Sequence, residues 1–153
     1  MKISLAKALK LKNEMAGNLN KLQNRLSRYN SVNVEQLENT PDRVKLFNEI
    51  IYISNKLAEL KGLIAQASIS IYPHFHLINE KKSFITFLEN LNKKHGKHTE
   101  TRGIHGDSEV VTYNAHITDN EANELIDENQ KEISELQDKI DEINATTFIE
   151  FEE

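Results

Sequence analysis

Histidine, which binds metals and exchanges protons near neutral pH, is confined to one stretch of this chain. All six histidines lie between His74 and His116, although the chain has 153 residues. The same stretch is rich in cations, because six lysines and arginines fall between Lys81 and Gly106, against two acidic residues. A basic, histidine-rich segment of this kind predicts a place where a ligand is held.

Two histidine pairs, His74-x-His76 and His95-x-x-His98, have spacings that metal sites use. A structural zinc site needs about four ligands at fixed geometry. The first pair would point to one side only in a strand, and the second would converge only in a helix. Surface histidines are therefore favoured over a metal site, and neither a metal nor a cofactor is predicted.

Catalytic groups are no better supported than a metal site. His105, Asp107 and Ser108 are the residue types of a hydrolytic triad, but near neighbours in one turn rarely reach the required geometry. The segment from Gly103 to Gly106 matches no phosphate-loop fingerprint. The chain also has no cysteine, which excludes thiolate chemistry. A non-enzymatic protein is predicted, and a metal-dependent enzyme that uses the histidines is the third alternative.

Binding of a small anion suits the basic segment better. Arg102 can hold phosphate through two parallel hydrogen bonds, and Lys97 and Lys94 add positive charge. Phe75 or Tyr113 offers a ring on which a purine can stack. Tyr113 would share a strand face with apolar residues, which favours a core role for that ring. The predicted ligand-binding residues are Arg102, Lys97, Lys94, His105, Tyr113, Asn114, His116 and Phe75.

The first half of the chain must supply a helical scaffold. Apolar residues at helical spacing predict a helix from about Ser4 to Tyr29, followed by a polar linker. Thr40, with a proline after it, predicts the N-cap of a second helix. Its apolar stripe steps by four and three through Leu46, Ile50, Ile53, Leu57, Leu60, Ile64 and Ala67. A second stripe consists of Val44, Phe47 and Ile51, and a partner helix is expected.

The segment that carries the histidines follows. Alternation from Ser68 to Tyr72 and the ring of Pro73 indicate that the helix is interrupted there. A short third helix is predicted from Asn79 to about Asn92. Its expected inward-facing residues are Phe84, Phe87, Leu88 and Leu91. A strand at 108–117 is predicted to pair with 98–102 through a turn at 103–107.

The last third returns to the helical scaffold. Thr118-Asp119-Asn120-Glu121 is a capping box, which predicts a helix from there to about Ala145. Asn129 falls at a core-type position, where a polar side chain fixes helix register and oligomer state. The β-branched and aromatic end at 146–151 predicts a short strand or docked apolar side chains.

The amino-acid composition limits the class of protein and the fold class. The chain is 38% hydrophobic and 28% charged, and its formal charge of −5 argues against binding to duplex nucleic acid. Its start lacks a signal-peptide core and no window resembles a membrane span, so a cytoplasmic protein that does not bind membranes is predicted. The expected fold is one α+β, mostly α, domain. Long antiparallel, coiled-coil-like helices at 4–67 and 118–145 would carry the insert 68–117, which contains a short helix and a β-hairpin.

Three narrow helices cannot enclose much core alone, so a homo-oligomer that associates through the heptad faces is predicted. The inserts of neighbouring chains would then meet and form a ligand site together. The alternative is a structural or protein-interaction helical module without a small-molecule ligand.

Several segments resemble a septicolysin-like family of bacterial and phage proteins. The likeness is carried by the start, Met1-Lys2-Ile3-Ser4-Leu5-Ala6-Lys7-Ala8-Leu9, and by Ser108-Glu109-Val110. It continues in Glu132-Ile133-Ser134-Glu135-Leu136-Gln137-Asp138-Lys139-Ile140 and Ile143-Asn144-Ala145-Thr146-Thr147. The chain departs from the family at Ala145, where an aromatic residue is usual, and in a shorter basic run before the strand. No membrane-inserting segment supports the cytolytic activity that the family name implies.

A second likeness is one of type, and it carries no residue across. Small oligomeric phage proteins that sequester immune signals are similar in size, in helix content and in having a basic, aromatic insert. The leading functional prediction is therefore sequestration of a small phosphorylated ligand, such as a cyclic nucleotide or an ADP-ribose-type signal. If the chain is phage-encoded, it would act in anti-defence from the host cytoplasm.

Overall fold

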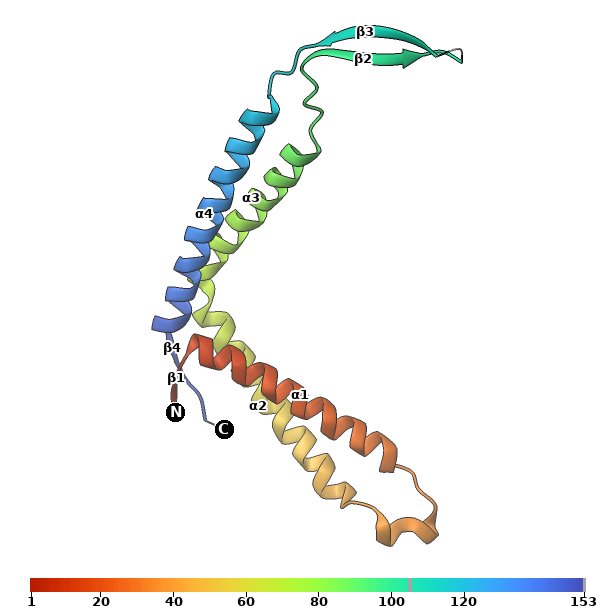
Figure 1. The fold of residues 1–153 in the computed structure, drawn as a ribbon. Helices are drawn as coiled ribbons and strands as arrows, with labels where there is room; N and C mark the ends of the chain where they lie inside the picture. The colour runs from red at the N-terminus through yellow and green to blue at the C-terminus, as the bar shows by residue number, and fades with distance from the viewer. Residues whose placement is uncertain (105, 153) are drawn as a thin grey trace. The chain divides into compact units, whose positions relative to one another are not determined.

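Long helices in antiparallel pairs make up most of the chain, together with a β-hairpin (Figure 1). The structure is a computed structural model that describes residues 1–104 and 106–152. In chain order the elements are β1 (Lys2–Ser4), α1 (Leu5–Tyr29), the 3-10 helix η1 (Val34–Asn39), α2 (Arg43–Ala67), the 3-10 helix η2 (Ile69–Ile71), α3 (Tyr72–Asn90), β2 (Gly96–Arg102), β3 (Asp107–Tyr113), α4 (Asp119–Thr146) and β4 (Phe148–Glu150).

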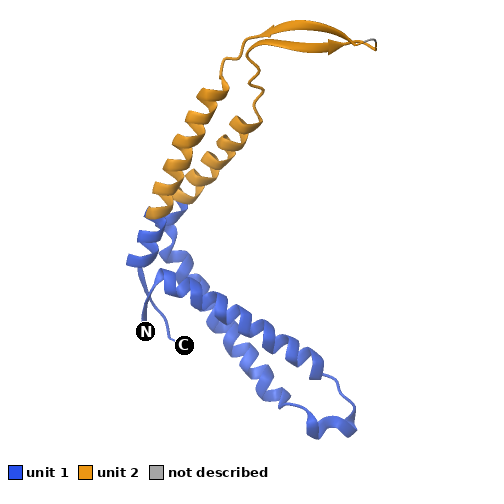
Figure 2. Cartoon of the chain, in the orientation of Figure 1, with its two compact units in different colours: residues 1–72, 139–153 blue, residues 73–138 orange. Residues whose placement is uncertain are grey.

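The chain divides into two compact units (Figure 2). Unit 1 contains residues 1–72 and 139–153, and unit 2 contains residues 73–138. The division differs from the predicted scaffold and insert, because residues 119–138 of α4 belong with α3 and the hairpin. Among the described residues, no helix is long and apolar enough to cross a membrane.

In unit 1, α1 and α2 form an antiparallel pair (Figure 1). The predicted stripe of α2 is confirmed, since it supplies the buried side chains Leu46, Leu57, Leu60 and Ile64. The predicted N-cap at Thr40 is wrong. Asp42 caps α2 instead, and its carboxylate accepts a 2.9 Å hydrogen bond from the Lys45 amide. The Thr40 hydroxyl donates to the carbonyl of Leu37, which closes η1.

Two short strands join the ends of the chain in unit 1. The residues before α1, expected only to lead into a helix, form β1, which pairs antiparallel with β4 and places Ile3 opposite Ile149. The Met1 ammonium group donates to the Phe151 carbonyl at 2.8 Å. The pairing with β1 confirms the strand that was predicted near residue 148. Phe151, which follows this strand, is 1% exposed.

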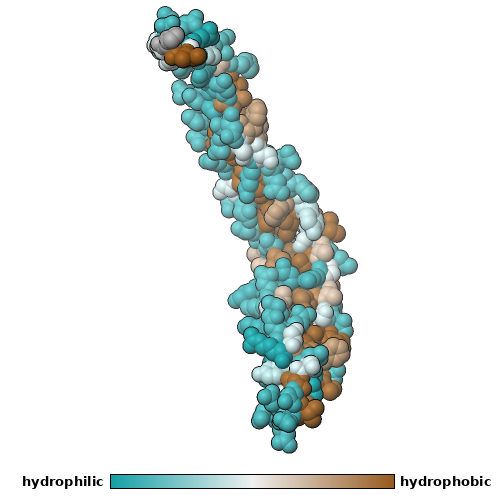
Figure 3. Space-filling view, turned by 90° about the vertical axis from the view of Figure 1, so that its right-hand side faces the viewer, coloured by the Kyte–Doolittle hydropathy of each residue, from teal (hydrophilic) through white to brown (hydrophobic). Residues whose placement is uncertain are grey.

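The second stripe of α2 is not covered within unit 1. Val44, Phe47 and Ile51 are 72%, 53% and 45% exposed. We call these three residues the outer face of α2, because helical periodicity places their centre on a different side of the helix from Leu46, Leu57 and Ile64. Figure 3 shows that hydrophobic side chains reach the surface among hydrophilic ones on the face that it presents.

In unit 2, α3 begins earlier than predicted. Tyr72 is its first residue and Pro73 lies in its first turn, where a missing N–H breaks no helical hydrogen bond. Asn79 is therefore inside the helix and does not cap it. Leu88 is buried as predicted, but Phe84 and Phe87 are exposed, and their rings stack with centroids 6.1 Å apart.

Polar side chains link α3 to α4 within unit 2. The Lys81 ammonium group donates to Oδ1 of Asn129 at 3.3 Å and pairs with the Glu132 carboxylate. The Asn129 amide group also donates to the Leu125 carbonyl at 2.7 Å. Asn129, predicted at a core-type position, is half-buried and has partners on both helices. The contact favours one register of the two helices.

The predicted β-hairpin is confirmed, although its second strand ends at Tyr113 rather than at residue 117. β2 and β3 pair antiparallel from Gly96 opposite Tyr113 to Arg102 opposite Asp107. Gly103 and Gly106 have φ angles of 85° and 76°, a backbone conformation that glycine adopts at least cost. Their positions explain why the turn falls at this point of the sequence.

Candidate functional site

The register of the hairpin sorts its side chains onto two faces, because neighbouring residues of a strand point to opposite sides. One face carries most of the charges, and we call it the charged face. It consists of Gly96, His98, Glu100, Arg102, Asp107, Glu109, Val111 and Tyr113. The other we call the hydroxyl face, and it consists of Lys97, Thr99, Thr101, Ser108, Val110 and Thr112.

Lys94, Glu100 and Tyr113 form one cluster at the base of the hairpin. The Lys94 ammonium group lies 3.1 Å from Oε1 of Glu100 and 5.0 Å from the centroid of the Tyr113 ring. The Tyr113 hydroxyl donates to the same carboxylate oxygen. Lys94 and Tyr113 are thus brought together as predicted, but their shared partner is an acidic side chain of the same chain.

The same contacts shift the pKa values of all three groups. The hydrogen bond from Tyr113, followed by that from Lys94, lowers the pKa of Glu100 below its usual value. The hydrogen bond to Glu100 raises the pKa of Lys94 and also that of Tyr113. At neutral pH the cluster therefore holds a carboxylate, an ammonium and a neutral phenol, and the positive charge of Lys94 is already compensated.

Arg102 and Lys97, the predicted phosphate ligands, are not brought together in one chain. Arg102 lies on the charged face, where its Nη1 is 3.0 Å from Oε2 of Glu109. Lys97 is exposed on the hydroxyl face. The two are five positions apart on one strand, an odd separation that alternation places on opposite sides.

The remaining predicted residues are spread over unit 2. Phe75 lies in the first turn of α3. Since a helix rises about 1.5 Å per residue, Phe75 is roughly 20 Å from the end of α3 that leads to the hairpin. Asn114 and His116 follow β3 and are exposed. His105 lies outside the described residues. The predicted ligand-binding residues that the structure describes are therefore not gathered at one site within a single chain.

His95 and His98 make local contacts. Nδ1 of His95 accepts a 3.1 Å hydrogen bond from the Ala115 amide, which ties the segment before β2 to the segment after β3. Nε2 of His98 lies 3.0 Å from the His95 carbonyl, so this nitrogen must carry a proton. His74 and His76 are helical and point to different sides of α3. Among the described residues, no group of three or more possible ligands is placed to hold a metal.

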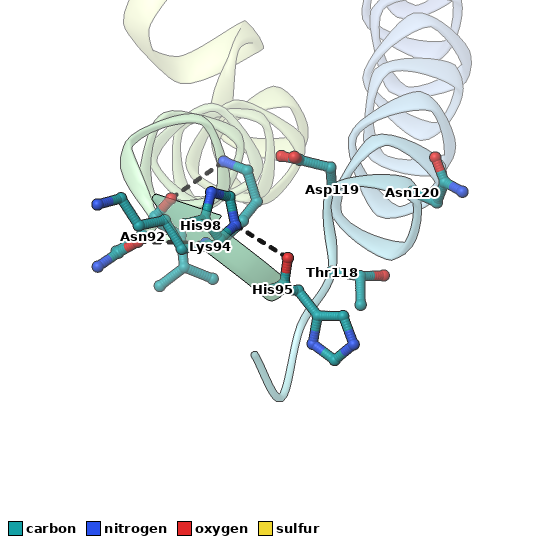
Figure 4. A pocket seen from close by; sticks show the side chains of 9 residues that line it. Asn92, Lys94, His95, His98, Thr118, Asp119 and Asn120 are labelled. Atoms are coloured by element: carbon teal, nitrogen blue, oxygen red, sulfur yellow. Dashed lines mark hydrogen bonds between the residues drawn. The ribbon is translucent and has the colours of Figure 1, made fainter. Parts of the chain in front are cut away.

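A cavity of about 580 Å³ lies at the base of the hairpin (Figure 4). Lys94 is the predicted ligand-binding residue that lines it. His95 and His98, considered only as a metal-binding pair, and Asp119 were not among the predicted ligand-binding residues. The complete wall is Leu91, Asn92, Lys93, Lys94, His95, His98, Thr118, Asp119 and Asn120. The Lys93 ammonium group donates to the carbonyls of Leu88 and Leu91, at 2.8 and 3.1 Å, so it caps α3.

The capping box at the start of α4 limits what this cavity can hold. The Glu121 carboxylate accepts a 2.9 Å hydrogen bond from the Thr118 amide, and the Thr118 hydroxyl accepts from the Glu121 amide at 3.4 Å. The backbone hydrogen bond from Thr118 lowers the pKa of Glu121. With Asp119 beside it, the positive end of the helix dipole already faces two carboxylates. The wall is mixed in charge and does not favour anions strongly.

Comparison of the chain with protein-family models, with curated proteins and with solved structures gives no match. The likeness to septicolysin-like proteins and to phage proteins that sequester signals therefore stays a prediction.

Proposed function

We propose that the chain is a non-catalytic helical module that acts by association, and that a second copy of the chain covers the outer face of α2. The observation that carries this proposal is the exposure of Val44, Phe47 and Ile51 at the spacing of a coiled-coil seam. Exposed apolar residues in a contiguous row mark interaction surfaces. A helix with apolar rows on two sides needs two partners, and α1 covers one side.

The surroundings of the outer face favour a copy of the same chain. The polar residues beside it are Asn48, Ser54 and Asn55, which are uncharged and exposed, and Arg43 at one end, whose guanidinium group donates to the Asn30 carbonyl at 3.2 Å. Two identical faces that meet antiparallel therefore place no like charges opposite one another, because the two Arg43 side chains lie at opposite ends. Burying a Phe or Ile side chain fully contributes about 1.5–3 kcal/mol relative to exposure, so three half-exposed residues per chain supply a useful driving force.

The test is the mass of the protein in solution, measured by light scattering over a range of concentrations. The wild-type chain is expected above its monomer mass of 17.6 kDa. Phe47→Glu should shift it toward the monomer, because a carboxylate would be buried in the seam. Asn13→Glu is the matched control, since it adds the same charge to an exposed position of α1, away from the outer face of α2, and should leave the mass unchanged. A wild-type chain that stays monomeric would refute the proposal.

A second candidate function is capture of a small phosphorylated ligand, such as a cyclic nucleotide or an ADP-ribose-type signal. The observation in its favour is the cavity at the hairpin base, whose volume of about 580 Å³ suits a small molecule. Lys94 would exchange Glu100 for phosphate, and the His98 ring would add a polar contact. The opposite placement of Arg102 and Lys97 means that a second chain would have to complete the cationic side of the site.

Thermal unfolding with and without cyclic nucleotides or ADP-ribose tests this second function. A binder present at about a hundred times its Kd should stabilise the fold by about 2.7 kcal/mol. Lys94→Ala should remove that shift, and Arg102→Ala should reduce it. Lys82→Ala, an exposed lysine on α3, should leave it intact. No shift with any of these compounds would count against ligand capture and in favour of an interaction module alone.

A further inference from the structure

The outer edge of β3 is unpaired among the described residues. β2 and β3 form a two-stranded sheet, so each strand has one edge without a ladder partner. Unpaired edges present backbone N–H and C=O groups that template another strand. Natural proteins protect such edges with lysine, proline or a bulge.

The two edges of the hairpin differ in this protection. β2 carries Lys97 on the hydroxyl face and Arg102 on the charged face, whereas β3 contains no lysine or proline and its two charged residues, Asp107 and Glu109, both lie on the charged face. The side chains of β3 on the hydroxyl face are Ser108, Val110 and Thr112, all uncharged and exposed. Val110 is 63% exposed at the middle of the strand. β-Branched residues of this kind pack well against a neighbouring strand.

The hairpin also lacks a core beneath it. Its strand residues are exposed or half-buried, and none is fully buried. A two-stranded hairpin is marginally stable in water, whereas three or more strands support one another. A further strand at the β3 edge would supply the missing packing.

We infer that β3 pairs antiparallel with β3 of a second copy, so that two hairpins form one four-stranded sheet with its two-fold axis at Val110. In this register Val110 lies opposite its own copy and Ser108 lies opposite Thr112. On the charged face, Glu109 lies opposite Val111 and Asp107 lies opposite Tyr113. All seven residues of β3 are paired, and no like charges face each other directly.

Neighbouring registers either place like charges opposite each other or pair fewer residues. A centre at Glu109 places that carboxylate against its own copy, and a centre at Ser108 places Asp107 against Glu109. A centre at Val111 avoids like charges but pairs fewer residues within the strand. At the favoured centre the two Glu109 side chains are diagonal neighbours, and each has Arg102 of its own hairpin at 3.0 Å to compensate its charge.

This pairing goes beyond the association through α2, because β3 belongs to unit 2 and the outer face of α2 belongs to unit 1. Two separate self-complementary surfaces on one chain would allow assemblies larger than a dimer.

Single cysteines test the register directly, because the chain has none of its own. Val110→Cys should give a covalent dimer on mild oxidation or with a short bismaleimide, since opposite Cβ atoms lie about 5 Å apart. Thr99→Cys is the matched control, because Thr99 lies opposite Val110 on β2 and on the same face. It should not cross-link. A mixture of Ser108→Cys and Thr112→Cys chains should cross-link, whereas each variant alone should not.

Failure of Val110→Cys to form a dimer, or equal cross-linking of Thr99→Cys, would overturn the pairing of β3. Cross-linking of Ser108→Cys alone would overturn the register. These outcomes are independent of the α2 experiment, because they report one residue position in unit 2. If Phe47→Glu lowers the mass and Val110→Cys does not cross-link, association through α2 is supported and the pairing of the hairpins is refuted.

Discussion

The Tyr113 hydroxyl and the Lys94 ammonium group share one acceptor, the Glu100 carboxylate. Residue types alone mark Lys94 and Tyr113 as ligand-binding groups, yet in the fold they bind a side chain of their own hairpin. The same applies to Arg102, which pairs with Glu109. A cation in a basic segment is therefore available to a ligand only if its acidic neighbours lie on another face.

Glu100→Gln should lower the pH at which Tyr113 ionises. In the folded chain, Glu100 raises the pKa of Tyr113. The neutral phenol therefore contributes fully to stability below the usual tyrosine pKa of 10.0. This contribution is lost as the pH rises through the pKa that Tyr113 has in the folded chain. The pH dependence of stability that comes from Glu100 has the opposite sign. Its pKa is lowered, so its contribution is full above 4.5 and is lost as pH falls through the folded value.

The measurement for this prediction is the titration of the Tyr113 ring by NMR. Glu135→Gln is the control, because Glu135 is an exposed residue of α4 that is not among the groups that shift the pKa of Tyr113, and it should leave the Tyr113 titration unchanged. An unchanged Tyr113 titration in Glu100→Gln would show that the hydroxyl group does not depend on this carboxylate in solution.

At the scale of elements, local patterns succeeded at some helix starts and failed at others, since neither Thr40 nor Asn79 caps a helix. The capping box of Thr118 and Glu121 forms as predicted, because its hydrogen bonds depend on neighbouring residues only. The inward placement of Phe84 and Phe87 was wrong. The apolar side of α3 is wider than the part that the fold buries, and periodicity cannot tell which part has a partner.

Lys81→Ala should weaken unit 2 by about 1 kcal/mol, since it removes a half-buried ammonium group that bonds Asn129 and Glu132 across α3 and α4. Urea unfolding monitored by circular dichroism measures this loss. Lys82→Ala removes the adjacent exposed lysine and should change the unfolding free energy by less than about 0.5 kcal/mol. Equal effects of the two substitutions would mean that the contact between the helices contributes nothing to stability.

At the scale of the whole chain, the sequence predicted the helices and the hairpin but not how the chain closes. β1 has only three residues, and its partner lies at the other end of the chain, so no local pattern reveals the pair. The predicted site failed for a different reason. The separation of Lys97 and Arg102 on opposite faces follows from strand alternation and could have been foreseen once both were assigned to one strand.

Phe151→Ala tests the closure of unit 1. The side chain is 1% exposed, so its removal should cost about 3–5 kcal/mol of unfolding free energy. Phe148 is 54% exposed in the same terminal segment, and Phe148→Ala should cost less than about 1 kcal/mol. Thermal or urea unfolding of both variants makes the comparison. Similar losses for the two would place Phe151 outside the core in solution.

The hydrogen bond between Met1 and Phe151 spans 150 positions of sequence, so the ladder beside it is as non-local as this chain allows. During synthesis on the ribosome, β1 is made before β4 and must wait for the residues between them before its partner exists. Until then Ile3 and Leu5 stay in water, where they attract chaperones or other nascent chains. A circular permutant that joins the old ends through a short peptide, with new ends opened in η1, would make this pairing local and should fold faster.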